Sequence, residues 1–154
     1  MGTKKSFTNN IKLHVFIADD DPEDIDFFKL ALQEIAKDVK LTVAKNGLEL
    51  LDFLKVVIPD IIFLDINMPA MNGLDCLAQI RKQQSLDMVP VIIYSTAASK
   101  ADIYKSYILG ANRFIKKPVY FDAIKKQLAQ TLALNLKDLT EKSVMETYVV
   151  NLTE

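Results

Sequence analysis

Residues 61–73 read IIFLDINMPAMNG, and this stretch decides how the rest of the chain is interpreted. Its first four residues are all apolar, as in a strand that is buried on both faces inside a parallel sheet. Asp65 ends the run, and Pro69 and Gly73 then take the chain out through a turn. A buried strand that delivers one carboxylate to the edge of a sheet is typical of a reaction centre. An Asp that only caps the following turn gives the same pattern, so the function of Asp65 depends on the side chains it meets.

The composition is that of an ordinary soluble globular protein. The 154 residues are 50% hydrophobic and 25% charged, which predicts one domain with a sizeable core. The net charge of −1 gives no basic surface for nucleic acid. No apolar run is long enough for a membrane span or a signal peptide, so we expect a cytoplasmic protein with no membrane partner. The single cysteine, Cys76, excludes an internal disulfide and a cysteine-rich zinc module.

Apolar periodicity predicts strands that alternate with helices along most of the chain. The expected strands are 13–18, 40–44, 60–65, 90–94 and 112–116, and the expected helices are 22–37, 48–54, 74–80, 99–109 and 121–134. This alternation predicts an α/β fold, with a doubly wound parallel sheet covered by helices on both faces. We expect a flexible leader at 1–11, a domain at 12–135 and a C-terminal tail at 136–154, which is too short for an output domain.

Chemically active side chains follow four of the predicted strands. In an open parallel sheet the functional site lies outside the carboxyl ends of the strands. At those ends the sequence places Asp19 and Asp20 after the first strand, Asp65 after the third, Ser95 and Thr96 after the fourth and Lys117 after the fifth. A purely structural interpretation, in which the acids cap a helix and the lysine is solvated, leaves this joint placement unexplained.

The predicted cluster of acids indicates a divalent cation. Two carboxylates about 6 Å apart repel by roughly 3 kcal/mol at an effective dielectric constant near 20. Oxygen ligands favour Mg²⁺ or Mn²⁺ over zinc, and Mg²⁺ tends to bind a phosphate together with one or two carboxylates. A carboxylate can itself accept a phosphoryl group, and the charge that develops is then stabilised by a metal, a hydroxyl and an ammonium group. The acids, Ser95 and Lys117 supply that set.

These residues resemble those of a known family, the receiver domains of two-component response regulators. The resemblance covers about 12–135. It rests on Asp19-Asp20 after the first strand, Asp65 with Met68-Pro69 and Gly73, Ser95 after the fourth strand, and Lys117-Pro118. It implies a flavodoxin-like receiver fold whose five strands lie in the order 2-1-3-4-5.

The resemblance also implies a phosphoacceptor site. Asp65 would accept a phosphoryl group from a sensor histidine kinase or a phosphotransfer protein. Asp20 would ligate Mg²⁺ directly with Asp65, Asp19 would act through water, and Asn67 would contribute its backbone carbonyl. Mn²⁺ is the alternative ion.

Other residues acquire roles from the same resemblance. Lys117 would pair with the phosphoryl group, and the bond between Lys117 and Pro118 would be cis. Ser95 would move to hydrogen-bond the phosphate, and Phe114 would follow it inward as a switch. Thr96 stands where the family usually has Ala or Gly, so it either narrows the pocket or shares the hydroxyl role.

The function implied is that of a single-domain response regulator, which switches the binding of an unknown downstream protein or relays phosphate. Such a protein is a phosphoacceptor rather than an enzyme, although it can catalyse its own phosphorylation and dephosphorylation, and the sequence leaves a homodimer open. The alternatives are a phosphorylation-independent scaffold, a hydrolase of the haloacid-dehalogenase type and a flavodoxin-like binder of a flavin phosphate. The hydrolase needs a second acid where Asn67 stands, and the flavin site needs a hydroxyl-rich cradle where the Asp run stands.

Overall fold

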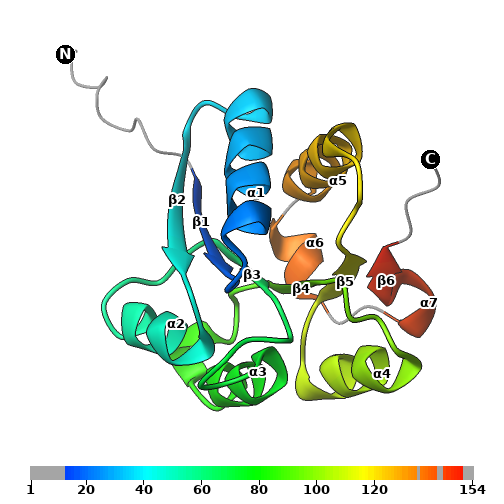
Figure 1. Ribbon diagram of the computed structural model, residues 1–154. Coiled ribbons are helices and arrows are strands. Elements are labelled where there is room, and N and C mark those ends of the chain that lie inside the picture. The colour runs from blue at the N-terminus through cyan, green and yellow to red at the C-terminus, as the bar shows by residue number, and fades with distance from the viewer. Residues whose placement is uncertain (1–12, 135, 142–143, 151–154) are drawn as a thin grey trace.

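A computed structural model describes residues 13–134, 136–141 and 144–150. Within these ranges, one parallel sheet has the strand order β2-β1-β3-β4-β5-β6 (Figure 1). The strands are β1 (Leu13–Ala18), β2 (Val39–Ala44), β3 (Ile61–Leu64), β4 (Val91–Ser95), β5 (Arg113–Lys116) and β6 (Val149–Val150). The predicted fold class and the order of the first five strands are confirmed. The tail adds a sixth strand that the sequence analysis does not predict, and the leader lies outside the described residues.

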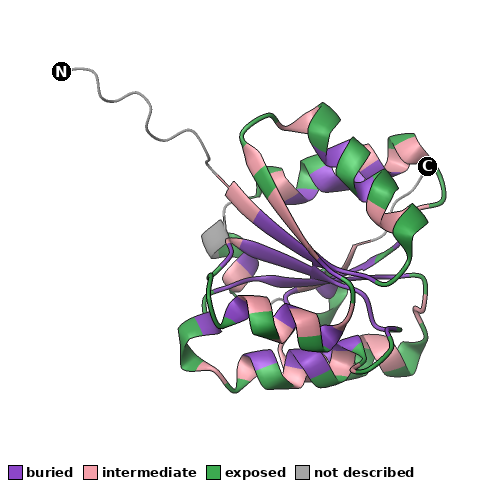
Figure 2. Cartoon of the chain, turned by 60° about the vertical axis from the view of Figure 1, so that its left-hand side comes forward, coloured by how far each residue is buried: buried purple, intermediate pink, exposed green. Residues whose placement is uncertain are grey.

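The helices form two layers, one on each face of the sheet (Figures 1 and 2). One layer contains α1 (Pro22–Ile35) and α5 (Phe121–Ala133), and the other contains α2 (Gly47–Leu54), α3 (Gly73–Arg81) and α4 (Lys100–Leu109). Shorter helical segments are η2 (Gln84–Leu86), α6 (Leu136–Thr140) and α7 (Met145–Tyr148). None of the helices within the described ranges is long and apolar enough to cross a membrane.

The core lies on both faces of the sheet because successive strand residues point to opposite sides. In β3, Ile62 packs into the core under α2, α3 and α4, whereas Phe63 packs into the core under α1 and α5. Phe63, Phe28 and Tyr94 form a cluster of edge-to-face rings with centroids 5.1 to 6.2 Å apart. Figure 2 shows the resulting pattern, with buried strands at the centre and exposed residues on the outer sides of the helices.

Local capping fixes where α1 begins, and this start matters for the site. Asp21 is the N-cap residue, and its carboxylate accepts a hydrogen bond of 2.9 Å from the backbone N–H of Glu23. Pro22 occupies the first turn, where its missing N–H costs nothing. Because the helix starts at Pro22, only two residues after Asp20, the carboxyl end of β1 and the first turn of α1 lie at the same edge of the sheet.

Candidate functional site

Three acidic side chains meet at the carboxyl ends of β1 and β3. Asp19 is fully buried, Asp65 is 7% exposed, and Asp20 is exposed to solvent. One carboxylate oxygen from each of the three lies within 4.8 Å of the other two. Neighbouring strands hold the acids in this position, since the N–H of Asp19 donates to the carbonyl of Ala44 and that of Asp65 to the carbonyl of Ala18. The predicted cluster is therefore present.

Lys117 enters this cluster from the end of β5. Its Nζ lies 2.7 Å from Oδ2 of Asp19, 2.8 Å from Oδ2 of Asp24 and 3.3 Å from Oδ2 of Asp65. The lysine side chain is only 7% exposed, so these ion pairs are shielded from water. The predicted meeting of a lysine with the acids is thus observed.

Asp24 is a site residue that the sequence analysis does not predict. In the sequence it only favours the start of a helix. In the structure it lies in the first turn of α1, and its carboxylate accepts a hydrogen bond of 2.8 Å from Nζ of Lys117. Its position in the first turn of α1, five residues after Asp19, could have indicated that it lies near the same edge of the sheet.

The burial of these groups shifts their pKa values in opposite senses. Burial raises the pKa of Asp19 from 3.8 to about 6, although its interaction with Lys117 and a hydrogen bond from Asp21 oppose the shift. Burial alone would lower the pKa of Lys117, but hydrogen bonds to Asp19 and Asp24 outweigh it and raise that pKa. Lys117 is therefore a permanent cation at neutral pH, and the ionised form of Asp19 is destabilised by its burial.

The residues of this cluster fit a divalent cation. The ligand set consists of oxygen atoms, which suits Mg²⁺. Oδ1 of Asp19 accepts a hydrogen bond of 3.0 Å from the N–H of Asp21, and Oδ1 of Asp65 accepts one of 2.8 Å from Ile66. Among the described side chains, Oδ2 of Asp19 is a buried oxygen without a well-directed hydrogen bond, although the Lys117 ammonium lies beside it. That oxygen has unused capacity for a cation.

The hydroxyl residues at the end of β4 differ in their surroundings. Ser95 is fully buried, and its Oγ accepts a hydrogen bond of 3.1 Å from the N–H of Ala97, whereas Thr96 is exposed. The backbone carbonyl of Ser95 accepts a hydrogen bond from the N–H of Lys117, which joins the hydroxyl strand to the lysine strand. Phe114 is fully buried on β5, and the side chain of Asn67 is exposed.

The expected cis bond between Lys117 and Pro118 is wrong. No described peptide bond in the structure is cis, and this one is trans. The trans form is the favoured isomer of a bond to proline by about 0.5–1 kcal/mol. With this bond trans, Nζ of Lys117 lies 3.3 Å from Oδ2 of Asp65.

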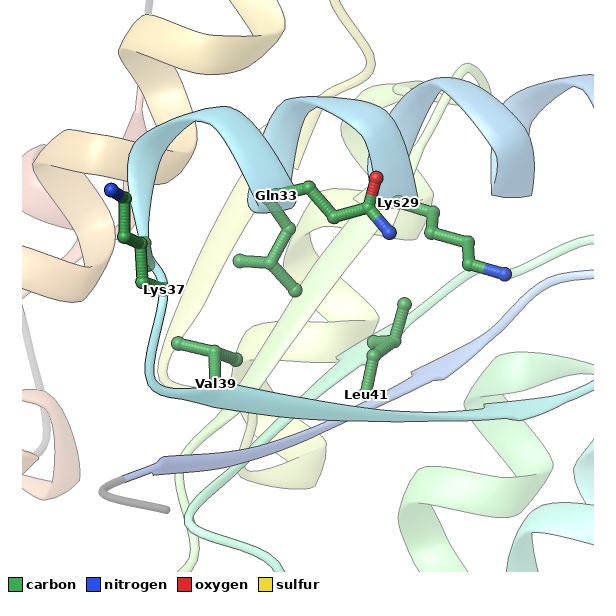
Figure 3. Close-up of a pocket in the computed structure, with 7 residues that line it drawn as sticks. Lys29, Gln33, Lys37, Val39 and Leu41 are labelled. Atoms are coloured by element: carbon green, nitrogen blue, oxygen red, sulfur yellow. The ribbon is translucent and has the colours of Figure 1, made fainter. Parts of the chain in front are cut away.

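A separate hollow of about 440 Å³ lies between α1 and β2 (Figure 3). Its lining residues are Lys29, Leu32, Gln33, Ala36, Lys37, Val39 and Leu41. Val39 is the first residue of β2, so this hollow is at the opposite end of the strands from Asp19 and Asp65. It contains no carboxylate or hydroxyl for phosphoryl chemistry.

The comparisons with known proteins agree with this geometry. The family described as "Response regulator receiver domain" matches residues 15–129. The phosphorylated cyanobacterial phytochrome response regulator RcpA is 26% identical with a TM-score of 0.73, and the match covers 77% of this chain and 90% of that one. The Mn²⁺-bound response regulator Rcp1 is 24% identical with a TM-score of 0.71, over 77% of this chain and 91% of that chain, which shows the fold alone.

Among curated proteins, a probable cyclic di-GMP phosphodiesterase of Vibrio cholerae is 27% identical over 85% of this chain. The match spans only 31% of that relative, and only 22% of a protein-glutamate methylesterase from Clostridium acetobutylicum. What these relatives share with the chain is thus a module of receiver size and not a whole protein. The family match extends from β1 to α5 and includes every residue of the acidic cluster, so the chain belongs to the response regulator receiver domain family.

Proposed function

We propose that Asp65 accepts a phosphoryl group in a reaction that depends on Mg²⁺, and that the chain signals through this modification. The observation that carries the proposal is the contact of the nearly buried Asp65 with Lys117, beside two further carboxylates within 4.8 Å. A partly exposed carboxylate can be reached by a donor, while its buried surroundings keep competing water away.

The phosphodonor fits the chemistry of a phosphohistidine on a sensor kinase or phosphotransfer protein. A carboxylate oxygen of Asp65 forms the new P–O bond as the P–N bond breaks, and the imidazole leaves with that electron pair and takes up a proton from solvent. Lys117 lies where it would pair with the transferred group, at 3.3 Å from Oδ2 of Asp65. Ser95 would donate its hydroxyl hydrogen to a phosphoryl oxygen.

Asp20 and Asp65 would ligate the divalent ion directly, Asp19 would act through water, and the backbone carbonyl of Asn67 would complete the protein ligands. When bound, Mg²⁺ would neutralise part of the charge on the phosphoryl oxygens. The existence of a Mn²⁺-bound form of Rcp1 and of a phosphorylated form of RcpA supports a divalent ion and a phosphoryl group in the chemistry of this chain.

A hydrolase is not favoured, because the position two residues after Asp65 is Asn67 with an exposed side chain. A scaffold that works without phosphate is not favoured either, because three buried or partly buried acids share one lysine, an arrangement that costs stability and that a scaffold does not need.

The test is phosphorylation of the purified chain by acetyl phosphate, followed by intact mass. We expect a gain of one phosphoryl group with Mg²⁺ and none with a chelator. Asp65→Asn should show no gain, whereas Asp52→Asn, at an exposed position on α2, should behave as the wild type. Equal phosphorylation of the Asp65→Asn variant would contradict the assignment of the acceptor.

A further inference from the structure

The two edges of the sheet differ in how they are covered. At one edge, β6 pairs in parallel with Phe114 and Ile115 of β5. At the other edge, β2 pairs with β1 along its whole length, and among the described strands it has no other neighbour. An edge strand presents a row of backbone N–H and C=O groups with which another extended chain can pair. With six residues, β2 offers such a chain a template of ordinary strand length.

The hollow between α1 and β2 lies at this open edge (Figure 3). Val39 and Leu41 are alternate residues of β2, so both side chains point to the same face of the sheet, toward α1. Leu32 and Ala36 of the α1 segment complete the apolar part of the lining. A strand added to β2 would continue this face of the sheet, and its own alternate side chains would enter the hollow beside Val39 and Leu41.

The hollow carries positive charge at both ends. Figure 3 shows Lys29 and Lys37 at opposite ends, with Gln33 between them. Both lysines are exposed, and the residues that line the hollow include no acid. Glu34, the neighbour of Gln33 on α1, is instead paired with Lys125 of α5 at 3.0 Å. The charges therefore suit a chain that carries acidic groups on either side of apolar ones.

The same charges disfavour the occupants that this chain itself could supply. Two copies that met through β2 would bring the exposed Lys40 of each strand, together with Lys29 and Lys37, near the same residues of the other copy. Like charges across paired strands are destabilising. Residues 1–12 contain three lysines and no acid, so their charge also opposes this site. An acidic strand from another protein meets neither obstacle.

We propose that α1 and β2 form a docking site for an extended, acidic segment of a partner protein. The segment pairs with the open edge of β2, fills the hollow with two alternate apolar side chains, and places acidic side chains against Lys29 and Lys37. Backbone pairing supplies affinity, while the hollow and the lysines select the side chains. The hollow is at the opposite end of the strands from Asp65, so the docking requires neither Mg²⁺ nor a phosphoryl group. The inference is independent of the proposed function.

The first test measures binding of a synthetic peptide to the full, unphosphorylated chain by fluorescence anisotropy. The labelled peptide has two valines at alternate positions, threonines around them and a glutamate at each end. We expect saturable binding. A peptide with lysines in place of the glutamates, and one with N-methylated backbone amides, should each bind at least tenfold more weakly. No saturable binding of the glutamate peptide, or equal binding of either control peptide, would overturn the inference.

The second test reverses the charges on the protein. A chain with both Lys29→Glu and Lys37→Glu should bind the glutamate peptide at least tenfold more weakly and the lysine peptide more tightly than the wild type does. Both positions are exposed, so the fold should tolerate the changes. Lys105→Glu, at an exposed position on α4, is the matched control and should bind as the wild type does. If the double variant keeps the wild-type preference for glutamate, the peptide is not held at this hollow.

Hydrogen exchange of the full chain then locates the bound peptide. We expect the amides of 39–44 to exchange at least threefold more slowly with saturating peptide, and those of 113–116 to be unchanged. Protection elsewhere but not at 39–44 would overturn the site. In the chain without peptide, protection of 39–44 that increases with protein concentration would identify a second copy as the occupant. Protection of residues 1–12 would identify the leader, and either result would overturn the acidic partner.

Discussion

Nζ of Lys117 is closer to Oδ2 of Asp19, at 2.7 Å, than to Oδ2 of Asp65, at 3.3 Å. The lysine therefore neutralises the proposed metal-binding acid more directly than the proposed acceptor. A divalent ion at the same cluster would compete with the ammonium for Asp19. Binding of the ion would then free the lysine to pair with a phosphoryl group on Asp65. The ion would therefore bind before the lysine contacts the phosphoryl group.

This competition predicts that Lys117→Met binds Mg²⁺ more tightly than the wild type. Removal of a positive charge a few ångströms from the ion should raise the affinity about tenfold, since about 1.4 kcal/mol is a small part of the repulsion between such charges. Isothermal titration calorimetry at pH 8 measures the effect, and Lys116→Met, at the exposed neighbouring position, is the matched control. Equal affinities in both variants would show that the lysine and the ion do not share Asp19.

The raised pKa of Asp19 predicts a pH dependence of stability. A carboxyl whose pKa is 3.8 when unfolded and about 6 when folded stabilises the fold below pH 4, and this contribution is lost as the pH rises through 6. At pH 7.5 the loss amounts to about 3 kcal/mol. We expect Asp19→Asn to raise the melting temperature at pH 7.5 without Mg²⁺ and to have little effect near pH 4.

The stabilisation of the fold by Mg²⁺ should increase with pH, because a proton on Asp19 competes with the ion. Thermal melts should show stabilisation by Mg²⁺ at pH 7.5 that largely disappears at pH 5. The Asp19→Asn variant should lose most of it at both pH values. Asp26→Asn, which alters an exposed acid of α1, should retain the wild-type profile. A wild-type response to Mg²⁺ that does not vary between pH 5 and 7.5 would contradict a role for Asp19 in the ion site.

The buried position of Ser95 predicts that it, and not Thr96, supplies the hydroxyl. Ser95→Ala should slow phosphorylation by acetyl phosphate by roughly tenfold or more, because a buried donor to a developing negative charge is lost. Thr96→Ala changes an exposed side chain and should alter the rate less than twofold. Both rates are measured by intact mass on samples quenched at successive times. The reverse ranking would assign the hydroxyl role to Thr96.

The acidic cluster could be predicted from the sequence because topology alone brings its members together. Asp19, Asp65 and Lys117 each stand at the carboxyl end of a parallel strand, so the apolar runs before them fix their positions. Asp24 could not be predicted in the same way, because its part in the site depends on how α1 is rotated against the sheet. The pattern of α1 indicates which side of the helix is buried but not which acid of its first turn reaches Lys117.

The position of the C-terminal segment could not be predicted from the sequence, for a different reason. Strand β6 is two residues long, which is too short for an alternating pattern, and α7 has a single buried side chain, Tyr148. The position of this segment depends on contacts with α4 and β5, which come together only when the rest of the domain has folded. The helix ends differ from their predicted bounds by one to two residues for a related reason, since hydrogen bonds at the ends decide them.

The loop between β3 and α3 supports the position of Asp65, and its backbone makes a paired prediction. A Cβ added to Gly73 would overlap the carbonyl oxygen of Asp65, and only a shift of the backbone can relieve that overlap. The N–H of Gly73 also donates a hydrogen bond of 2.7 Å to the carbonyl of Ile66. Gly73→Ala should therefore lower the free energy of unfolding by about 2–4 kcal/mol and slow the phosphorylation of Asp65.

In the same loop, Ala70 has a φ of 68°, in the left-handed region that an L-residue enters at a cost of about 1–2 kcal/mol. Ala70→Gly should leave stability unchanged or raise it by up to about 1 kcal/mol, and urea unfolding of both variants measures the contrast. If Gly73→Ala is no less stable than Ala70→Gly, the close approach of Gly73 to Asp65 does not constrain the loop.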